Sequence, residues 1–131
     1  MRWLAALLLF AGCGAEPPPK CTSTQLDDAC LPQYQPTFAN VYANTLTEDC
    51  GSTKGACHKN GGEAGLSFAD EDTAYNNLLN RHYVVPGGVA CSEFIVRTAD
   101  TGKDYSMPKD SAIGDSEKCA LQQWVRNGAQ R

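Results

Sequence analysis

The sequence predicts a small, mainly α-helical fold of about four helices joined by long loops. Apolar residues recur at helical spacing in four separate stretches of the 131 residues. Capping residues and glycines stand at the ends of most of these stretches. The strict alternation of apolar and polar residues that is typical of half-buried strands occurs nowhere in the chain. The length allows one domain.

The first helix is predicted over 37–48, because Phe38 and Val41 begin a run of apolar residues on one face. Thr37 can cap its start and Gly51 can end it. The second helix is predicted over 70–80.

Asp70 can cap this second helix, and Ala74 and Leu78 lie on its buried face. Further acidic residues in its first turn suit the positive end of the helix dipole. A turn over 84–88 follows.

The third helix is predicted over 90–98, with Cys91, Phe94 and Ile95 buried. The fourth is predicted over 116–127, with Gly128 as its stop.

A polar loop over 99–114 joins these two helices and carries Met107. Trp124 in the last helix is expected in the core. Contact between this indole and a bound cofactor is the alternative.

Residues 1–12 have the features of a bacterial export signal: Arg2 is followed by a short apolar core. This core is too short to span a bilayer, which takes roughly 20 apolar residues. Residues 10–13 resemble a lipobox, so Cys13 is predicted to carry a diacylglycerol. An ordinary secretory signal without lipidation is the alternative. Both place the mature chain outside the cytoplasm, and a lipid anchor would hold it at the cell envelope, facing the periplasm or the cell surface.

Residues 13–36 contain three consecutive prolines and few apolar residues, so an extended tether is predicted there. Cys21 and Cys30 lie within it, and a local disulfide between them is expected. The folded domain is predicted to occupy 37–131.

The net charge is −4, and lysines and arginines are scattered singly. The chain therefore lacks the basic stripe that nucleic-acid binding needs, and no contact with the membrane beyond the lipid anchor is expected. No combination of nucleophile and base indicates an enzyme.

The motif that carries most chemistry is Cys57-His58, with Cys50 upstream and Met107 about fifty residues downstream. A thiol beside an imidazole lets one short loop both tether a porphyrin and ligate its iron. A distant methionine thioether can close the other axial position. The usual attachment motif has two residues between its cysteines, whereas six separate them here.

Several fragments follow one another in an order that resembles a known family. After the first helix come the Cys-His loop, a Gly-Leu-x-Phe segment, a Val-Val-Pro-Gly turn, a Met-Pro loop and a terminal helix with the pattern Glu-x6-Trp-Val. This order is similar to that of the small class I c-type cytochrome domain, in the variant common on exported proteins of myxobacteria and planctomycetes. The resemblance covers about 90 residues.

The resemblance implies a cytochrome c-like bundle around one covalent haem c. Cys50 and Cys57 would form the thioethers, His58 would be the proximal ligand of the iron and Met107 the distal one. Two axial ligands leave no open position for a substrate, so electron transfer with redox partner proteins of the envelope is expected. A monomer is expected.

The cysteine count leaves alternatives open. Apart from Cys13 there are six cysteines, which suit three disulfides as well as two thioethers and two disulfides. In both readings the helix faces predict a disulfide between Cys91 and Cys119.

The alternative function is a haem-free envelope lipoprotein, stapled by disulfides that include Cys50 with Cys57, which acts as an interaction module. A zinc site at Cys50, Cys57 and His58 would lack a fourth ligand. His82 is the alternative to Met107 as an axial ligand.

Overall fold

The computed structural model describes residues 16–51, 56–59, 63–109 and 111–131. Within these ranges the regular secondary structure is helical and contains no strand, so the predicted mainly α-helical class is confirmed. The helices, of which η1 is a π-helix and η2 to η4 are single 3-10 turns, are α1 (Phe38–Val41), η1 (Tyr42–Gly51), η2 (Ala56–His58), η3 (Glu63–Gly65), α2 (Glu71–Asn80), η4 (Val89–Cys91), α3 (Glu93–Ala99) and α4 (Asp115–Arg126). None of the described helices is long and apolar enough to cross a membrane.

The first helix begins where the sequence predicts and ends slightly later. The Thr37 hydroxyl accepts a hydrogen bond from the Asn40 amide, 3.4 Å away, and so caps α1. The helix then widens into η1 without interruption and ends at Gly51. A Cβ at Gly51 would lie only 3.0 Å from the Leu46 carbonyl oxygen, so a side chain fits poorly there. This helix delivers the chain to the Cys-His segment.

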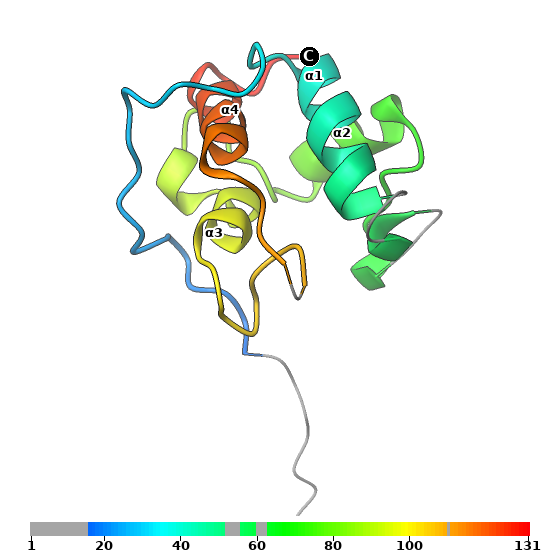
Figure 1. The fold of residues 1–131 in the computed structure, drawn as a ribbon. Helices are drawn as coiled ribbons and strands as arrows, with labels where there is room; N and C mark the ends of the chain where they lie inside the picture. The colour runs from blue at the N-terminus through cyan, green and yellow to red at the C-terminus, as the bar shows by residue number, and fades with distance from the viewer. Residues whose placement is uncertain (1–15, 52–55, 60–62, 110) are drawn as a thin grey trace, which may run out of the picture.

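The second and fourth helices also match their predicted ranges closely. The Asp70 carboxylate accepts a hydrogen bond from the Thr73 amide at 2.8 Å, which caps α2. The core forms where α1 and α3 both pack against α4 (Figure 1). Trp124 of α4 is buried there, and its ring centroid lies 5.2 Å from that of Phe38.

The predicted third helix is divided in two. Ser92 has extended backbone angles (φ −79°, ψ 121°) and separates the turn η4 from α3. Its hydroxyl accepts a hydrogen bond from the Val85 amide at 2.9 Å and donates one to the Gly88 carbonyl at 2.9 Å. Phe94 is buried as predicted. Cys91 is exposed, contrary to the prediction, because it lies in η4 before the helix starts.

The four cysteines predicted to form disulfides do so, but in a different pairing. The bonds join Cys21 to Cys91 and Cys30 to Cys119. The predicted pairs, Cys91 with Cys119 and Cys21 with Cys30, are therefore wrong. The reason is that Cys91 and Cys119 each face the N-terminal segment.

Residues 21–36 are consequently part of the folded unit and not a free tether. Figure 1 shows this segment, in blue, passing along one side of α3 and α4 before it enters α1. The Thr22 amide donates to the Ala90 carbonyl and the Gln33 amide to the Ser116 carbonyl, both at 2.8 Å. The two disulfides are compatible with an exported protein. The export signal and the lipidation predicted at Cys13 lie outside the described residues.

Candidate functional site

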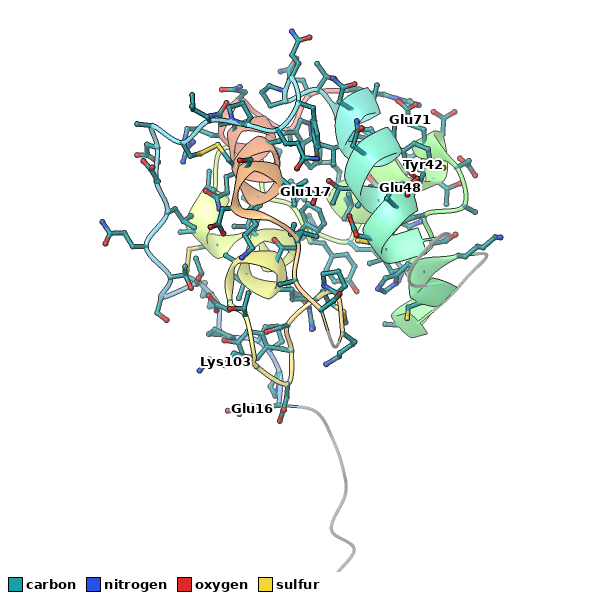
Figure 2. The ribbon with its side chains drawn as sticks, in the orientation of Figure 1. Glu16, Tyr42, Glu48, Glu71, Lys103 and Glu117 are labelled. Atoms are coloured by element: carbon teal, nitrogen blue, oxygen red, sulfur yellow. A yellow bond between two sulfur atoms is a disulfide. The ribbon has the colours of Figure 1, made fainter. Side chains whose placement is uncertain are left out.

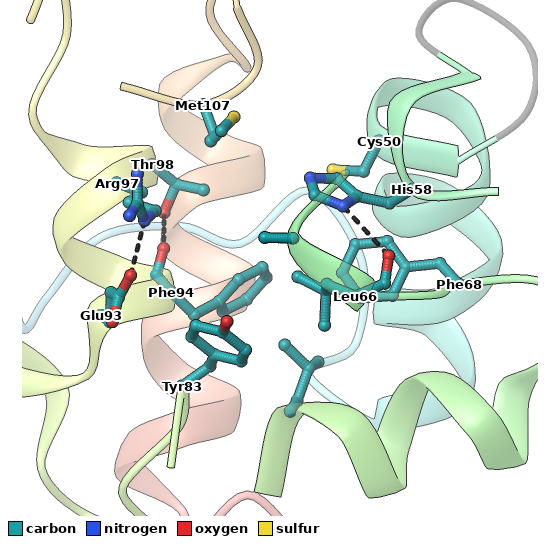
Figure 3. Close-up of a pocket in the computed structure, with 12 residues that line it drawn as sticks. Cys50, His58, Leu66, Phe68, Tyr83, Glu93, Phe94, Arg97, Thr98 and Met107 are labelled. Carbon is teal, nitrogen blue, oxygen red and sulfur yellow. Dashed lines mark hydrogen bonds and ion pairs between the residues drawn. The ribbon is translucent and has the colours of Figure 1, made fainter. Parts of the chain in front are cut away.

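A largely apolar cavity of about 130 Å³ lies between two walls of the molecule (Figure 3). The residues that line it come from the end of η1, the segments around η2 and η3, α2, α3 and the loop after α3. They are Cys50, His58, Ala64, Leu66, Phe68, Leu78, Tyr83, Glu93, Phe94, Arg97, Thr98 and Met107. Of the four residues predicted to hold a haem, three line this one cavity.

His58 stands on one wall, in the turn η2, where it is buried. Its ring Nδ1 lies 3.2 Å from the Leu66 carbonyl oxygen. A carbonyl oxygen can only accept, so Nδ1 carries a proton and donates, and in the neutral imidazole Nε2 keeps a free lone pair. The ring also packs against Phe68, with 5.3 Å between the ring centroids. The imidazole is therefore held in the tautomer and orientation that metal-bound histidines use.

Met107 stands on the opposite wall, in the loop that follows α3 (Figure 3). Its amide donates a hydrogen bond to the Arg97 carbonyl at 2.8 Å, which ties the loop to α3. Its side chain is partly buried and lines the same cavity as His58. An imidazole nitrogen and a thioether sulfur thus border one apolar space.

Cys50 and Cys57 are unpaired, unlike the other described cysteines. Cys50 lines the cavity, and burial is the main reason that the pKa of its thiol is raised to about 12, with the charges of Asp49 and Glu117 adding to the effect. Its thiol is therefore neutral at physiological pH. Cys57 is exposed and does not line the cavity.

The sequence prediction missed a charged pair in the wall that carries Met107. Arg97 donates from Nε to a Glu93 carboxylate oxygen at 2.7 Å, and both residues line the cavity. Its Nη1 also donates to the Tyr105 carbonyl at 3.0 Å. The i, i+4 spacing of Glu93 and Arg97 on one helix is the signal that could have identified the pair.

The alternatives for metal binding gain no support from the described residues. No three His, Cys, Asp or Glu side chains in that part of the chain are grouped so as to hold an ion, which leaves the zinc hypothesis without a site. His82 follows α2 with a φ of 58° and does not line the cavity. Trp124 does not line it either.

Comparison of the chain with protein-family models, with curated proteins and with solved structures finds no match.

Proposed function

We propose that this chain is a haem c-binding electron-transfer protein of the bacterial cell envelope. The observation that carries the proposal is the placement of His58 and Met107 on opposite walls of one apolar cavity. A neutral imidazole and a thioether are the axial ligand pair of low-spin cytochromes c. The Leu66 carbonyl adds support, because it leaves Nε2 of His58 free for the iron.

The cysteines support the same proposal. Two disulfides use four of the described cysteines, and the two that stay unpaired lie near His58, Cys50 on the same cavity and Cys57 next to it in the sequence. Cys50 and Cys57 would hold the haem through thioethers. The haem would supply one-electron chemistry. With two axial ligands in place it would offer no position to a substrate, so we propose electron transfer with envelope redox proteins and not catalysis.

The cavity is too small for a porphyrin as it stands, so haem binding requires it to widen. Pockets for drug-sized ligands measure roughly 300–1,000 Å³, whereas this cavity has about 130 Å³. A porphyrin therefore fits only if the wall that carries Met107 and the wall that carries His58 move apart. The wall that carries Met107 is hydrogen-bonded to α3, whereas His58 stands in a single 3-10 turn, which yields more easily, so the movement is expected on the His58 side.

The exposed position of Cys57 and the small cavity favour a second candidate function. In it the domain has no haem, Cys50 and Cys57 form a third disulfide in the oxidised protein, and the chain acts as an interaction module of the envelope. Anchoring through a lipid on Cys13 belongs to both candidates.

The first prediction is covalent attachment of one haem per chain. Expression with a haem-maturation system should give the mass of one haem and a Soret band that survives acid-acetone extraction. Cys57→Ser or His58→Ala should abolish stable attachment of a correctly ligated haem, because each removes a bond to the group.

Cys21→Ser/Cys91→Ser is the matched control, since it removes two thiols but leaves the Cys50 to His58 segment intact. This variant should retain the covalent haem. A colourless parent protein with no free thiols would instead support the haem-free interaction module.

A further inference from the structure

The loop that carries Met107 starts at a buried carboxylate. Asp100 is 5% exposed and follows the last residue of α3. Its Oδ1 accepts hydrogen bonds from the hydroxyls of Thr22 and of Thr24, the latter at 2.6 Å. Its Oδ2 accepts one from the Tyr105 hydroxyl at 3.0 Å. One carboxylate therefore joins the N-terminal segment, the end of α3 and the loop.

The loop is also fixed at Tyr105 and at the two residues that follow it. The Ser106 hydroxyl donates to the Asp100 carbonyl oxygen. The Met107 amide donates to the Arg97 carbonyl at 2.8 Å, and the Arg97 guanidinium donates to the Tyr105 carbonyl at 3.0 Å. The backbone that presents Met107 thus lies against α3 before any ligand is bound.

The hydrogen bonds to Asp100 are bonds to an ionised carboxylate. Burial raises the pKa of this carboxyl, but the hydrogen bonds from Thr22, Thr24 and Tyr105 outweigh it and leave the pKa below its ordinary value. The group is therefore ionised at neutral pH. Hydrogen bonds to an ionised carboxylate are shorter and stronger than those between neutral groups.

We propose that Asp100 is a positioning residue for Met107, which holds the loop so that the thioether faces His58 across the cavity. This inference rests on the proposed haem-binding function. A thioether is a neutral, weak ligand, and a loop that had to be ordered at the moment of coordination would oppose its binding. A loop that is already ordered lets Met107 compete with water and external ligands at the iron.

The test uses the full chain loaded with haem. In the parent protein, methionine ligation should give a weak far-red charge-transfer band in the ferric form and slow binding of carbon monoxide in the ferrous form. Met107→Ala sets the reference for complete loss of this ligand. Asp100→Asn should weaken the band and bind carbon monoxide about tenfold faster, a change equivalent to 1.4 kcal/mol in the ligation equilibrium.

Two further variants keep the test decisive. Tyr105→Phe removes one hydrogen bond to Asp100. It should change the far-red band and the carbon monoxide rate in the same direction by a smaller factor. It also provides the test if Asp100→Asn does not fold. Asp104→Asn removes an exposed carboxylate from the same loop and should leave both readouts at the parent values.

The outcomes separate this inference from the function on which it rests. Variants of Asp100 and Tyr105 that are less stable yet keep the parent band and the parent carbon monoxide rate would overturn the positioning role and leave the haem proposal intact. A parent protein that takes up no haem would overturn both.

Discussion

At the scale of single residues, a hydrogen-bonded network with two carboxyl groups lies near enough to Cys50 to raise the pKa of its thiol. The Tyr34 hydroxyl lies 2.5 Å from the Thr45 hydroxyl, which donates to the Glu117 carboxylate at 2.6 Å. Glu117 is 7% exposed, extends from α4 toward the first helix (Figure 2), and is hydrogen-bonded to Asp49. The network therefore connects the N-terminal segment, η1 and α4 at the back of the candidate site.

Glu117 should make stability fall as the pH rises. Burial raises the pKa of its carboxyl, and the neighbouring Asp49 raises it further, against the hydrogen bond from Thr45. The folded chain therefore holds this proton more tightly than the unfolded chain. The free energy of unfolding should decrease from the ordinary glutamate pKa, about 4.3, up through the raised pKa, with a slope of at most about 1.4 kcal/mol per pH unit for one proton.

Urea unfolding of the haem-free chain between pH 4 and 8 measures this slope. The free energy of unfolding of Glu117→Gln should fall less with rising pH than that of the parent protein, because the glutamine amide cannot ionise. Glu48→Gln removes an exposed carboxylate from the same helix and controls for the loss of one negative charge. Parallel curves for the parent and Glu117→Gln would contradict the prediction.

At the scale of elements, the join between the turn at 84–88 and α3 depends on one hydroxyl. Ser92 is 0% exposed. Its hydroxyl oxygen accepts a hydrogen bond from the Val85 amide, and the hydroxyl donates one to the Gly88 carbonyl. Periodicity alone extends the helix back through this position, but the hydroxyl bonds to the turn favour extended backbone there. This explains why the predicted single helix is divided.

Ser92→Ala should lower the free energy of unfolding by about 1–3 kcal/mol, because it leaves the Val85 amide and the Gly88 carbonyl without this partner. Chemical denaturation of the haem-free chain measures the change. Ser116→Ala, the same substitution at an exposed position in the first turn of α4, should change it by less than about 0.5 kcal/mol. Equal effects for the two variants would show that the Ser92 hydrogen bonds contribute nothing.

At the scale of the whole molecule, residues 21–36 form a strap along one side of α3 and α4 (Figure 1). Its disulfides close loops of 70 and 89 residues, and the hydroxyls of Thr22 and Thr24 reach Asp100. Leu26 and Tyr34 in the same segment pack against the core. The strap therefore contributes to stability and, through Asp100, to the loop that carries Met107.

Non-reducing peptide mapping should find Cys21 linked to Cys91 and Cys30 linked to Cys119. Loops of this length correspond to about 4.5 kcal/mol each in the chain-entropy account. Cys30→Ser/Cys119→Ser should therefore lower the free energy of unfolding by roughly 2–4 kcal/mol.

Cys57→Ser, which removes an exposed unpaired thiol, should leave the stability of the haem-free chain unchanged. Peptides that link Cys21 to Cys30 would contradict the arrangement of the strap.

Much of the helical framework could be predicted from the sequence because its signals are local. The caps at Thr37 and Asp70 and the buried faces of α2 and α4 involve residues only a few positions apart. The same local reasoning identified His58 and Met107 as candidate ligands, since residue type and neighbours alone suggest that chemistry.

The tertiary structure alone decided which distant residues meet. It paired Cys30 with Cys119, placed Thr24 on Asp100, and joined Thr45 to Glu117 across 72 positions. It also placed Met107 across a cavity from His58. Such contacts depend on how packed helices bring remote segments together, and the free energy that selects them comes from burial over the whole core, which no local pattern in the sequence contains.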